Sequence, residues 1–245
     1  MKRFDYLLTK WLYGSELVVR LVKKLDMPKG SKVLNLGCGP GKISEYLVKK
    51  MGIRVVAGDV FEEVLDIAKK RALKDGWISH VDFILIDRAN PYFGFEEYDG
   101  LVCETITSFL DPSRAVKAYF KALKPDRRLC ALELAWYKRP SRGIEEEIKA
   151  KFGPDVKILS DKEWRSLFQE AGLRLETGEV RRLSLTKKAL DDLRYDIIGS
   201  FLDMAKTFGI VIKSPEARKA TKDFLLIYKE YSNHLGLAEY VYSKR

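Results

Sequence analysis

The chain has 245 residues and a formal net charge of +10, with 46% hydrophobic and 33% charged residues. This composition is typical of a globular protein with a full core, and no apolar run reaches the roughly 18 residues that a membrane span needs. The first residues also lack the uninterrupted apolar core of a secretory signal. Composition therefore excludes a membrane-spanning chain and predicts a single cytoplasmic domain.

Cysteine and histidine are too few and too scattered to predict a metal centre or a disulfide framework. Cys38, Cys103 and Cys130 lie far apart and form no C-x-x-C pair, so we expect three small buried side chains. His80 and His234 have no His, Cys or acidic partner at the spacing of metal ligands. We therefore expect no metal site.

The polar residues bear on partners and origin. Basic residues occur as pairs along the whole chain rather than in one stretch, which favours solvated helix faces over an RNA-binding groove. Asparagine and glutamine are scarce while charged residues abound, a pattern common in proteins from hot environments. We therefore expect a thermophile's protein, with nucleic acid as a disfavoured partner.

The first thirty residues carry apolar side chains at helical spacing. Residues 6–12 and 17–25 each fit one face of a short helix, and a Pro-Lys-Gly turn at 28–30 follows the second one. Three aromatic side chains of this segment either line a ligand site or pack on the sheet that follows: Tyr6, Trp11 and Tyr13.

A strand, a glycine loop and a helix start come next. Residues 32–36 predict a short buried strand and residues 42–51 a helix, separated by a turn that contains Gly37, Gly39 and Gly41. Glycines are needed where the backbone takes positive φ or lies against a ligand, and the N–H groups of the following helix favour an electronegative group. The dinucleotide fingerprint G-x-G-x-x-G would have its third glycine at Lys42. The spacing G-x-G-x-G therefore indicates a different nucleotide loop.

Strand and helix patterns alternate beyond this loop. The expected strands are 53–58, 81–86, 99–103 and 128–135, and the expected helices are 61–74 and 112–122. Such alternation predicts a parallel sheet with helices on both faces, in which ligands lie at the carboxyl ends of the strands. Acidic residues follow three of these ends: Asp59, Asp87 and Glu104.

The G-x-G-x-G loop after a strand resembles the first motif of the class I S-adenosylmethionine-dependent methyltransferases. Tyr98 to Val102 is similar to the F-D-x-V strand of that family, and Leu123 to Asp126 is similar to its L-K-P-G turn. The resemblance covers roughly residues 30 to 135, with five elements in the family's order. It implies an α/β fold: a Rossmann-like, seven-stranded, mostly parallel sheet with helices on both faces, plus N-terminal helices and a helical insertion before the last strand.

The resemblance implies S-adenosyl-L-methionine as the cofactor and S-adenosyl-L-homocysteine as the product. The glycine loop would approach the methionine and ribose, Asp59 would accept hydrogen bonds from the ribose hydroxyls, and Asp87 with its neighbour would contact the adenine. Glu104 would lie near the sulfonium, where a carboxylate compensates charge, binds the amino group or accepts a proton. The implied cofactor contacts are Asn35, Gly37, Cys38, Gly39, Gly41, Asp59, Val60, Asp87, Arg88 and Glu104, and the catalytic candidates are Glu104 and Tyr137.

Several of these residues have a structural alternative. Asp59 can also cap the helix that begins near Glu62, and Asp87 can pair with Arg88 at the surface. Asn35 departs from the family, which usually has an acid at this position. Its amide keeps a hydrogen-bond acceptor but loses the charge, so the amino-acid end of the cofactor would be held differently.

The chain after strand five continues the same pattern. Trp136 and Tyr137 follow this strand, and we expect them to face the substrate cavity. Ser160, with Glu163 three residues later, predicts a capped helix start, and residues 173–183 predict a further strand.

We expect one methyltransferase domain over residues 1–245. Its parts are an N-terminal helical lid at 1–30, a core at 31–183, a helical insertion at 187–235 and a last strand at 237–243, antiparallel to its neighbour. The two apolar helical patterns of the insertion either cap the acceptor pocket or form a dimer interface, because hydrophobic stripes do not distinguish these roles. The chain is then a monomer or a homodimer.

The resemblance implies direct in-line transfer of a methyl group to a small-molecule or lipidic acceptor. A sulfonium methyl is already activated, so the protein mainly supplies proximity, orientation and a dry pocket. Four alternatives stay open: an RNA methyltransferase, a non-catalytic S-adenosylmethionine-binding module, a dehydrogenase, which Lys42 disfavours, and an aminopropyl transferase. After strand four the chain has Glu104 to Thr107, which is not the N/D-P-P-Y/F motif of enzymes that methylate amino nitrogens of nucleic-acid bases.

Overall fold

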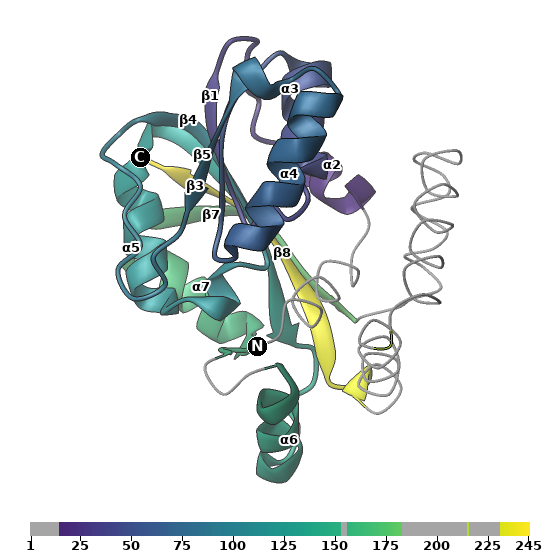
Figure 1. Ribbon diagram of the computed structural model, residues 1–245. Helices are drawn as coiled ribbons and strands as arrows, with labels where there is room; N and C mark the ends of the chain where they lie inside the picture. The colour runs from purple at the N-terminus through teal and green to yellow at the C-terminus, as the bar shows by residue number, and fades with distance from the viewer. Residues whose placement is uncertain (1–14, 153–155, 183–214, 216–230) are drawn as a thin grey trace.

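The computed structural model describes residues 15–152, 156–182, 215 and 231–245 (Figure 1). The predicted helix at 6–12, with Tyr6, Trp11 and Tyr13, and the predicted insertion up to residue 230 apart from residue 215, lie outside the described residues. In the described part of the chain no helix is long and apolar enough to cross a membrane.

One mixed sheet of eight strands forms the centre of the described structure, in the order β3, β2, β1, β4, β5, β8, β7, with the short β6 paired to β5. The strands β1 to β5 pair with one another in parallel, and β8 is antiparallel to both of its neighbours, β5 and β7. The α/β class and the mostly parallel sheet are confirmed, and β6 makes the eighth strand. The bounds are β1 Lys32–Leu36, β2 Arg54–Asp59, β3 Val81–Leu85, β4 Tyr98–Glu104, β5 Leu123–Trp136, β6 Leu159–Ser160, β7 Leu173–Arg182 and β8 Leu235–Lys244.

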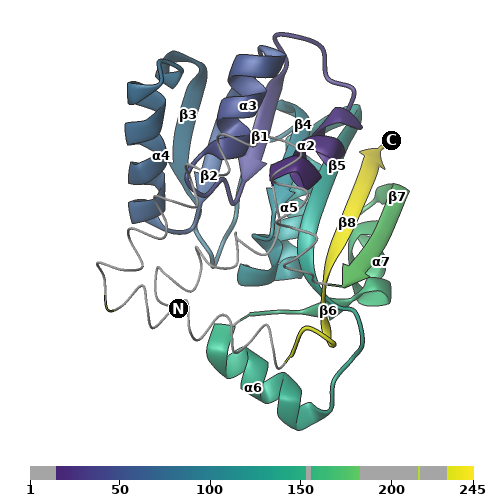
Figure 2. The same ribbon diagram turned by 90° about the vertical axis from the view of Figure 1, so that its right-hand side faces the viewer.

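Helices cover both faces of this sheet (Figure 2). The helices α2, α3 and α4 pack on one face and α5 and α7 on the other, so that each face has its own hydrophobic core. The bounds are α2 Ser15–Lys23, α3 Lys42–Met51, α4 Glu62–Lys74, α5 Pro112–Ala122, α6 Arg142–Phe152 and α7 Asp161–Glu170, with short 3-10 helices η1 Ile78–His80 and η2 Thr107–Phe109.

The helix starts follow from local chemistry. The Ser160 hydroxyl accepts a hydrogen bond from the N–H of Glu163, whose carboxylate accepts one from the N–H of Ser160, so the expected capping box is confirmed. At α5 the Asp111 carboxylate accepts from the N–H of Arg114, and Pro112 occupies the first helical position. These signals place both helices without tertiary contacts.

The strand order reverses between β1 and β4. From β1 the chain adds β2 and β3 on one side, whereas β4 and β5 extend the sheet on the other side. In an open α/β sheet the crevice at such a switch point, outside the carboxyl ends of the strands, is the usual ligand site. The glycine loop after β1 and Glu104 at the end of β4 flank this point.

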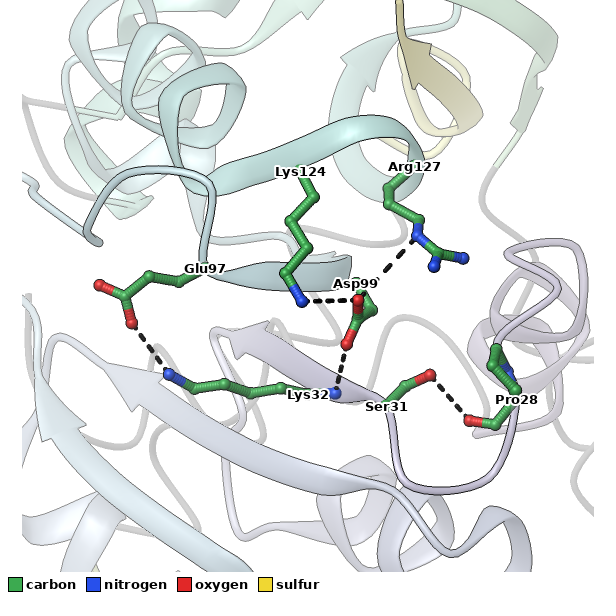
Figure 3. A network of polar contacts seen from close by, with 7 residues as sticks. All are labelled: Pro28, Ser31, Lys32, Glu97, Asp99, Lys124 and Arg127. Carbon is green, nitrogen blue, oxygen red and sulfur yellow. Dashed lines mark hydrogen bonds and ion pairs between the residues drawn. The ribbon is translucent and has the colours of Figure 1, made fainter.

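At the amino ends of the strands, opposite to the carboxyl ends just described, a network around Asp99 stabilises the sheet (Figure 3). Its carboxylate accepts a hydrogen bond from the backbone N–H of Lys32 at 2.9 Å and one from Lys124 Nζ at 2.8 Å, with Arg127 Nε 3.9 Å away. Partial burial raises the pKa of Asp99, but the bonds from Lys124 and from the backbone outweigh it, so the pKa lies below its usual value. The network joins the amino ends of β1, β4 and β5.

Replacing Asp99 with asparagine is expected to lower the free energy of unfolding by about 1 kcal/mol at neutral pH, since Lys124 is partly exposed and the pair is screened. Because the folded-state pKa is depressed, the contribution is complete above the unfolded pKa of about 4 and disappears as the pH falls through the folded value. Urea unfolding at several pH values measures this. Glu97→Gln is the control, because its pair with Lys32 is exposed; an equal loss in both variants would contradict the prediction.

Candidate functional site

The turn between β1 and α3 has the backbone that its glycines allow. Gly37, Gly39 and Gly41 have φ angles of 73°, 54° and 84°, a region that other residues rarely adopt. The N–H groups of Gly37 and Cys38 donate to the carbonyl of Gly58 at 2.7 and 3.1 Å, which ties the loop to the end of β2. The Cys38 side chain is buried.

Gly41 also has a packing role that its spacing did not predict. A Cβ atom at Gly41 would lie 3.2 Å from Trp77 Cη2 and 3.3 Å from the Cβ atom of Ala68. Gly41 immediately precedes α3, and Ala68 belongs to α4. The missing side chain therefore lets the start of α3 approach α4 and Trp77.

Asp59 joins the glycine loop to the start of α4. Its Oδ2 atom accepts from the N–H of Gly39 at 3.0 Å, and its Oδ1 atom accepts from the N–H groups of Val60 at 2.8 Å and Phe61 at 3.3 Å. The alternative that Asp59 caps α4 is wrong in its strict form, because the N-cap residue is Phe61. Asp59 instead orders the turn before the helix and contacts the loop, so acid and loop form one cradle.

Asn35 is the last residue but one of β1 and is completely buried. Its Nδ2 atom donates to Ser44 Oγ of α3 at 3.0 Å, and its Oδ1 atom has no hydrogen-bond partner among the described residues. A buried polar atom without a partner costs about 1–3 kcal/mol, which suits an atom that receives a donor from a ligand.

Glu104 ends β4 beside the glycine loop. In the parallel register Cys103 pairs with Leu36, the residue before Gly37, so Glu104 lies at the level where the loop begins. Glu104 is buried, and the next residue, Thr105, has a φ of 51°. A non-glycine residue in this region costs about 1–3 kcal/mol, and such strain is typical of functional sites.

Asp87 and Arg88 lie two and three residues beyond β3, and both are exposed. The N–H of Ile86, directly before Asp87, donates to the carbonyl of Asp59 at 2.8 Å. The Asp87 carboxylate accepts from the N–H of Ala89 at 2.9 Å, whereas Arg88 Nε donates to the carbonyl of Phe109 at 3.1 Å. The alternative of an ion pair between the two is therefore wrong. Arg88 connects the turn after β3 to the turn after β4, on either side of the β2 and β1 ends.

Trp136 and Tyr137 lie at the carboxyl end of β5, two strands from the glycine loop. Tyr137 is 53% exposed, and its N–H donates to the carbonyl of His234 at 2.8 Å. Trp136 is buried on the same face as Leu132 and Leu134, and its indole N–H has no partner among the described residues. Trp164, by contrast, donates to the carbonyl of Leu134 at 3.0 Å.

We expect replacement by phenylalanine to lower the free energy of unfolding by different amounts at these two tryptophans. Trp164→Phe removes a satisfied hydrogen bond and indole volume, whereas Trp136→Phe removes similar volume and a donor without a partner. We expect Trp164→Phe to lower the free energy of unfolding by about 1 kcal/mol more than Trp136→Phe. Chemical denaturation of both variants measures the difference. Equal costs would mean that the Trp136 N–H has a partner after all.

The sequence analysis did not predict two further residues near the site, Thr105 and Glu133. The positive φ of Thr105 has no sequence signal, because a β-branched residue rarely adopts it. Glu133 is a fully buried carboxylate of β5 whose partners belong to η2. Its signal was a single acid in the apolar run 129–135. Among the described residues, no three His, Cys, Asp or Glu side chains gather as metal ligands do.

The arrangement suits a nucleoside with a cationic amino-acid tail. Backbone N–H groups and a carboxylate meet at the glycine loop, as a ribose requires, and Asn35 Oδ1 offers a buried acceptor for an ammonium group. The residues present therefore fit S-adenosylmethionine, judged by the loop conformation and by the unpartnered amide oxygen.

Comparison with known proteins agrees with this geometry. Residues 33–126 match the family described as methyltransferase domain. The chain is 27% identical over 122 residues to the methyltransferase GfsG of Streptomyces halstedii, and 28% identical over 183 residues to phosphoethanolamine N-methyltransferase 1 of Arabidopsis thaliana. These matches span 49% and 73% of this chain but only 44% and 36% of the two relatives, so the chain spans less than half of either.

A solved structure matches over the whole length. The crystal structure of an S-adenosylmethionine-dependent methyltransferase from Thiobacillus denitrificans, in complex with S-adenosylhomocysteine, superposes with a TM-score of 0.69 at 19% identity. The match covers 100% of this chain and 99% of that one. At this identity the likeness establishes the fold.

Proposed function

Because residues 33–126 of this chain form a methyltransferase domain on the class I fold of S-adenosylmethionine-dependent enzymes, we propose that it transfers a methyl group from S-adenosylmethionine to a small-molecule or lipidic acceptor. One observation carries the proposal: the Asp59 carboxylate meets the N–H of Gly39 at the switch point of the sheet. An acid and a glycine loop in contact at this place are what a nucleoside cofactor needs.

In this proposal the residues of the chain bind and orient the cofactor. Gly37, Gly39 and the Cys38 backbone would lie against the methionine and ribose, Asp59 would accept from the ribose hydroxyls, and Asn35 Oδ1 would accept from the ammonium group. When bound, S-adenosylmethionine supplies a methyl group already activated by its sulfonium. Glu104 balances positive charge beside this centre or takes a proton from the acceptor.

The remaining cofactor contacts of the proposal lie around the cradle. Val60, whose N–H donates to Asp59, would border the ribose, and Asp87 and Arg88 would contact the adenine. Gly41 fixes the position of α3. Tyr137 stays in the proposal as a second catalytic candidate, with its partly exposed ring at the end of β5.

The acceptor side is the less specific half of the proposal. The two relatives named above are methyltransferases, and the name of the Arabidopsis protein states a small acceptor, phosphoethanolamine. The buried N–H of Trp136 is a donor that an oxygen of the acceptor can use. We further propose one domain in which residues 1–30 and 187–235 cover the acceptor, with a dimer interface as the alternative role of the second segment. A cytoplasmic location and a thermophilic origin belong to the same proposal and rest on composition.

Asn35 favours a second candidate function, that of a module that binds S-adenosylmethionine without turnover. The family usually has an acid here, and the neutral amide supplies no charge to the ammonium group. Such a module would bind the cofactor and release it unchanged.

Calorimetric titration separates these functions. We expect binding of S-adenosylmethionine and S-adenosylhomocysteine and none of NAD. Turnover is then assayed by S-adenosylhomocysteine release with panels of small amines, phenols and prenyl or fatty-acyl compounds, and with RNA. Binding without turnover on any panel would favour the module, and absence of binding would end the proposal.

A further inference from the structure

A buried acid on the α5 face of the sheet holds the turn that follows β4. Glu133 of β5 is completely buried in a strand whose neighbouring residues from Leu129 to Trp136 are apolar. The environment on this face is apolar as well, since Ala131, Ala135 and Ala238 belong to its core. A carboxylate in such a place costs several kcal/mol unless its oxygens are hydrogen-bonded.

The turn supplies those hydrogen bonds from two successive residues. Glu133 Oε1 accepts from the N–H of Thr107 at 3.3 Å and from its hydroxyl, and Oε2 accepts from the N–H and hydroxyl of Ser108, each at 3.3 Å. All of these groups are donors, as an ionised carboxylate requires. The Tyr119 hydroxyl of α5 lies 3.2 Å from Thr107 Oγ1 and extends the network. Burial raises the pKa of Tyr119 well above its usual value, so its hydroxyl stays protonated.

The same turn begins at the candidate site. Thr105, with its φ of 51°, follows Glu104 directly and donates its N–H to the carbonyl of Leu132 at 2.6 Å. Its hydroxyl donates to the Glu104 carbonyl at 2.8 Å. A strained residue keeps its conformation only where its surroundings fix it. Two residues later, the chain is fixed by Glu133.

We propose that Glu133 is a positioning residue of the methyl-transfer site, which holds residues 105–109 so that Glu104 and the Thr105 backbone keep their place beside the glycine loop. This inference rests on the proposed function. Removing this carboxylate would leave the buried N–H and hydroxyl groups of Thr107 and Ser108 without their acceptor. Glu133 therefore fixes the backbone of this turn at two successive residues, directly after Glu104 and Thr105.

The test separates affinity from stability. Glu133→Leu, Glu133→Gln and the remote control Asp99→Asn are compared with the unaltered chain in the Kd for S-adenosylhomocysteine by calorimetry and in urea unfolding. We expect both Glu133 variants to bind at least about fivefold more weakly, the range for residues that act through a network. Both Glu133 variants should also lose stability, because buried donors of Thr107 and Ser108 are left unsatisfied. Asp99→Asn should lose stability as well, yet bind within about twofold of the unaltered chain, so a loss of affinity in the Glu133 variants alone is not a general effect of destabilisation.

The outcomes are distinct. Normal affinity in Glu133→Leu, or a loss that only follows the unfolded fraction, would overturn the positioning role. If Glu133→Leu does not fold, Glu133→Gln decides, because it keeps the volume and turns an amide NH₂ toward two donors. Absence of binding by the unaltered chain would refute the proposed function itself, and the inference with it.

Discussion

Replacing Asp59 with alanine is expected to weaken S-adenosylmethionine binding about 100-fold, which corresponds to roughly 3 kcal/mol. The variant loses the carboxylate that would accept from both ribose hydroxyls, and such charge-assisted bonds are about twice as strong as neutral ones. It also loses the bond to the N–H of Gly39, so the loop itself is less well held. Calorimetry at a temperature where the variant is folded measures the effect.

Glu62→Ala is the matched control for this variant. Glu62 is an exposed acid in the first turn of α4, three residues after Asp59, so its removal changes the net charge by the same amount. We expect its affinity to stay within about twofold of the unaltered chain, as for a screened surface charge. If both variants bind alike, long-range charge explains the effect and the ribose contact is wrong.

Asp59→Asn refines the same prediction. Each carboxylate oxygen of Asp59 accepts a backbone N–H, from Gly39 on one side and from Val60 and Phe61 on the other. An asparagine amide must turn its NH₂ group toward one of these donors. We therefore expect a loss of stability of about 1–2 kcal/mol beside the loss of affinity, because one donor is left unsatisfied. An asparagine variant as stable as the original would contradict the geometry.

The sequence predicts the part of this site that is built from neighbours along the chain. The strand, the three glycines and the helix from 32 to 51 follow from apolar runs and turn residues, and β1 and α3 have the predicted bounds. The capping box at Ser160 is likewise local. Short-range chemistry sets where such elements begin and end, so a pattern is enough to place them.

Contacts between segments far apart in the chain could not be predicted from the sequence. Glu133 and Thr107 are 26 residues apart, and the N–H of Lys32 reaches Asp99 across 67 residues. The pairing of β5 with β4 also begins earlier than expected, at Leu123 rather than at 128, because Leu123 pairs with Tyr98 beyond a register shift. Apolar patterns do not report such pairings, since the residues involved are polar or lie in turns.

The alternative pairings that proved wrong share one cause. Asp59 and Asp87 were weighed against partners a few residues away, a helix cap and Arg88. In the structure Asp59 also contacts Gly39, 20 residues earlier, and Arg88 contacts Phe109, 21 residues later. Asp87 itself keeps a local partner, the N–H of Ala89. At the carboxyl edge of a parallel sheet the ends of separate strands lie side by side, so Asp59 and Arg88 also have partners on other crossovers.

The replacement of Gly41 by alanine should have the second large effect, a loss of about 2–3 kcal/mol in the free energy of unfolding. Two costs add at this position. The left-handed φ of 84° is unfavourable for any residue with a Cβ atom, and that atom would come within 3.2 Å of Trp77 Cη2 and 3.3 Å of the Ala68 Cβ. Neither the indole nor the methyl group is the end of a flexible side chain.

Gly76→Ala isolates the first of these costs. Gly76 has a φ of 74°, and an added Cβ atom would meet nothing within 4 Å. We expect this variant to lose only the conformational part, about 1–2 kcal/mol. Urea unfolding of the two variants gives the packing cost as their difference, and a difference of zero would mean that Trp77 yields without strain.

A second substitution then tests whether Trp77 is the obstacle. Trp77→Phe removes the ring atoms that crowd Gly41, so Gly41→Ala should cost less in that background than in the unaltered chain, and a double-mutant cycle gives the coupling. Because Gly41 precedes α3 directly, displacement of the alanine backbone would move the glycine loop with it. The affinity for S-adenosylhomocysteine should therefore fall in Gly41→Ala and recover in part in the double variant, whereas Gly76→Ala leaves it unchanged.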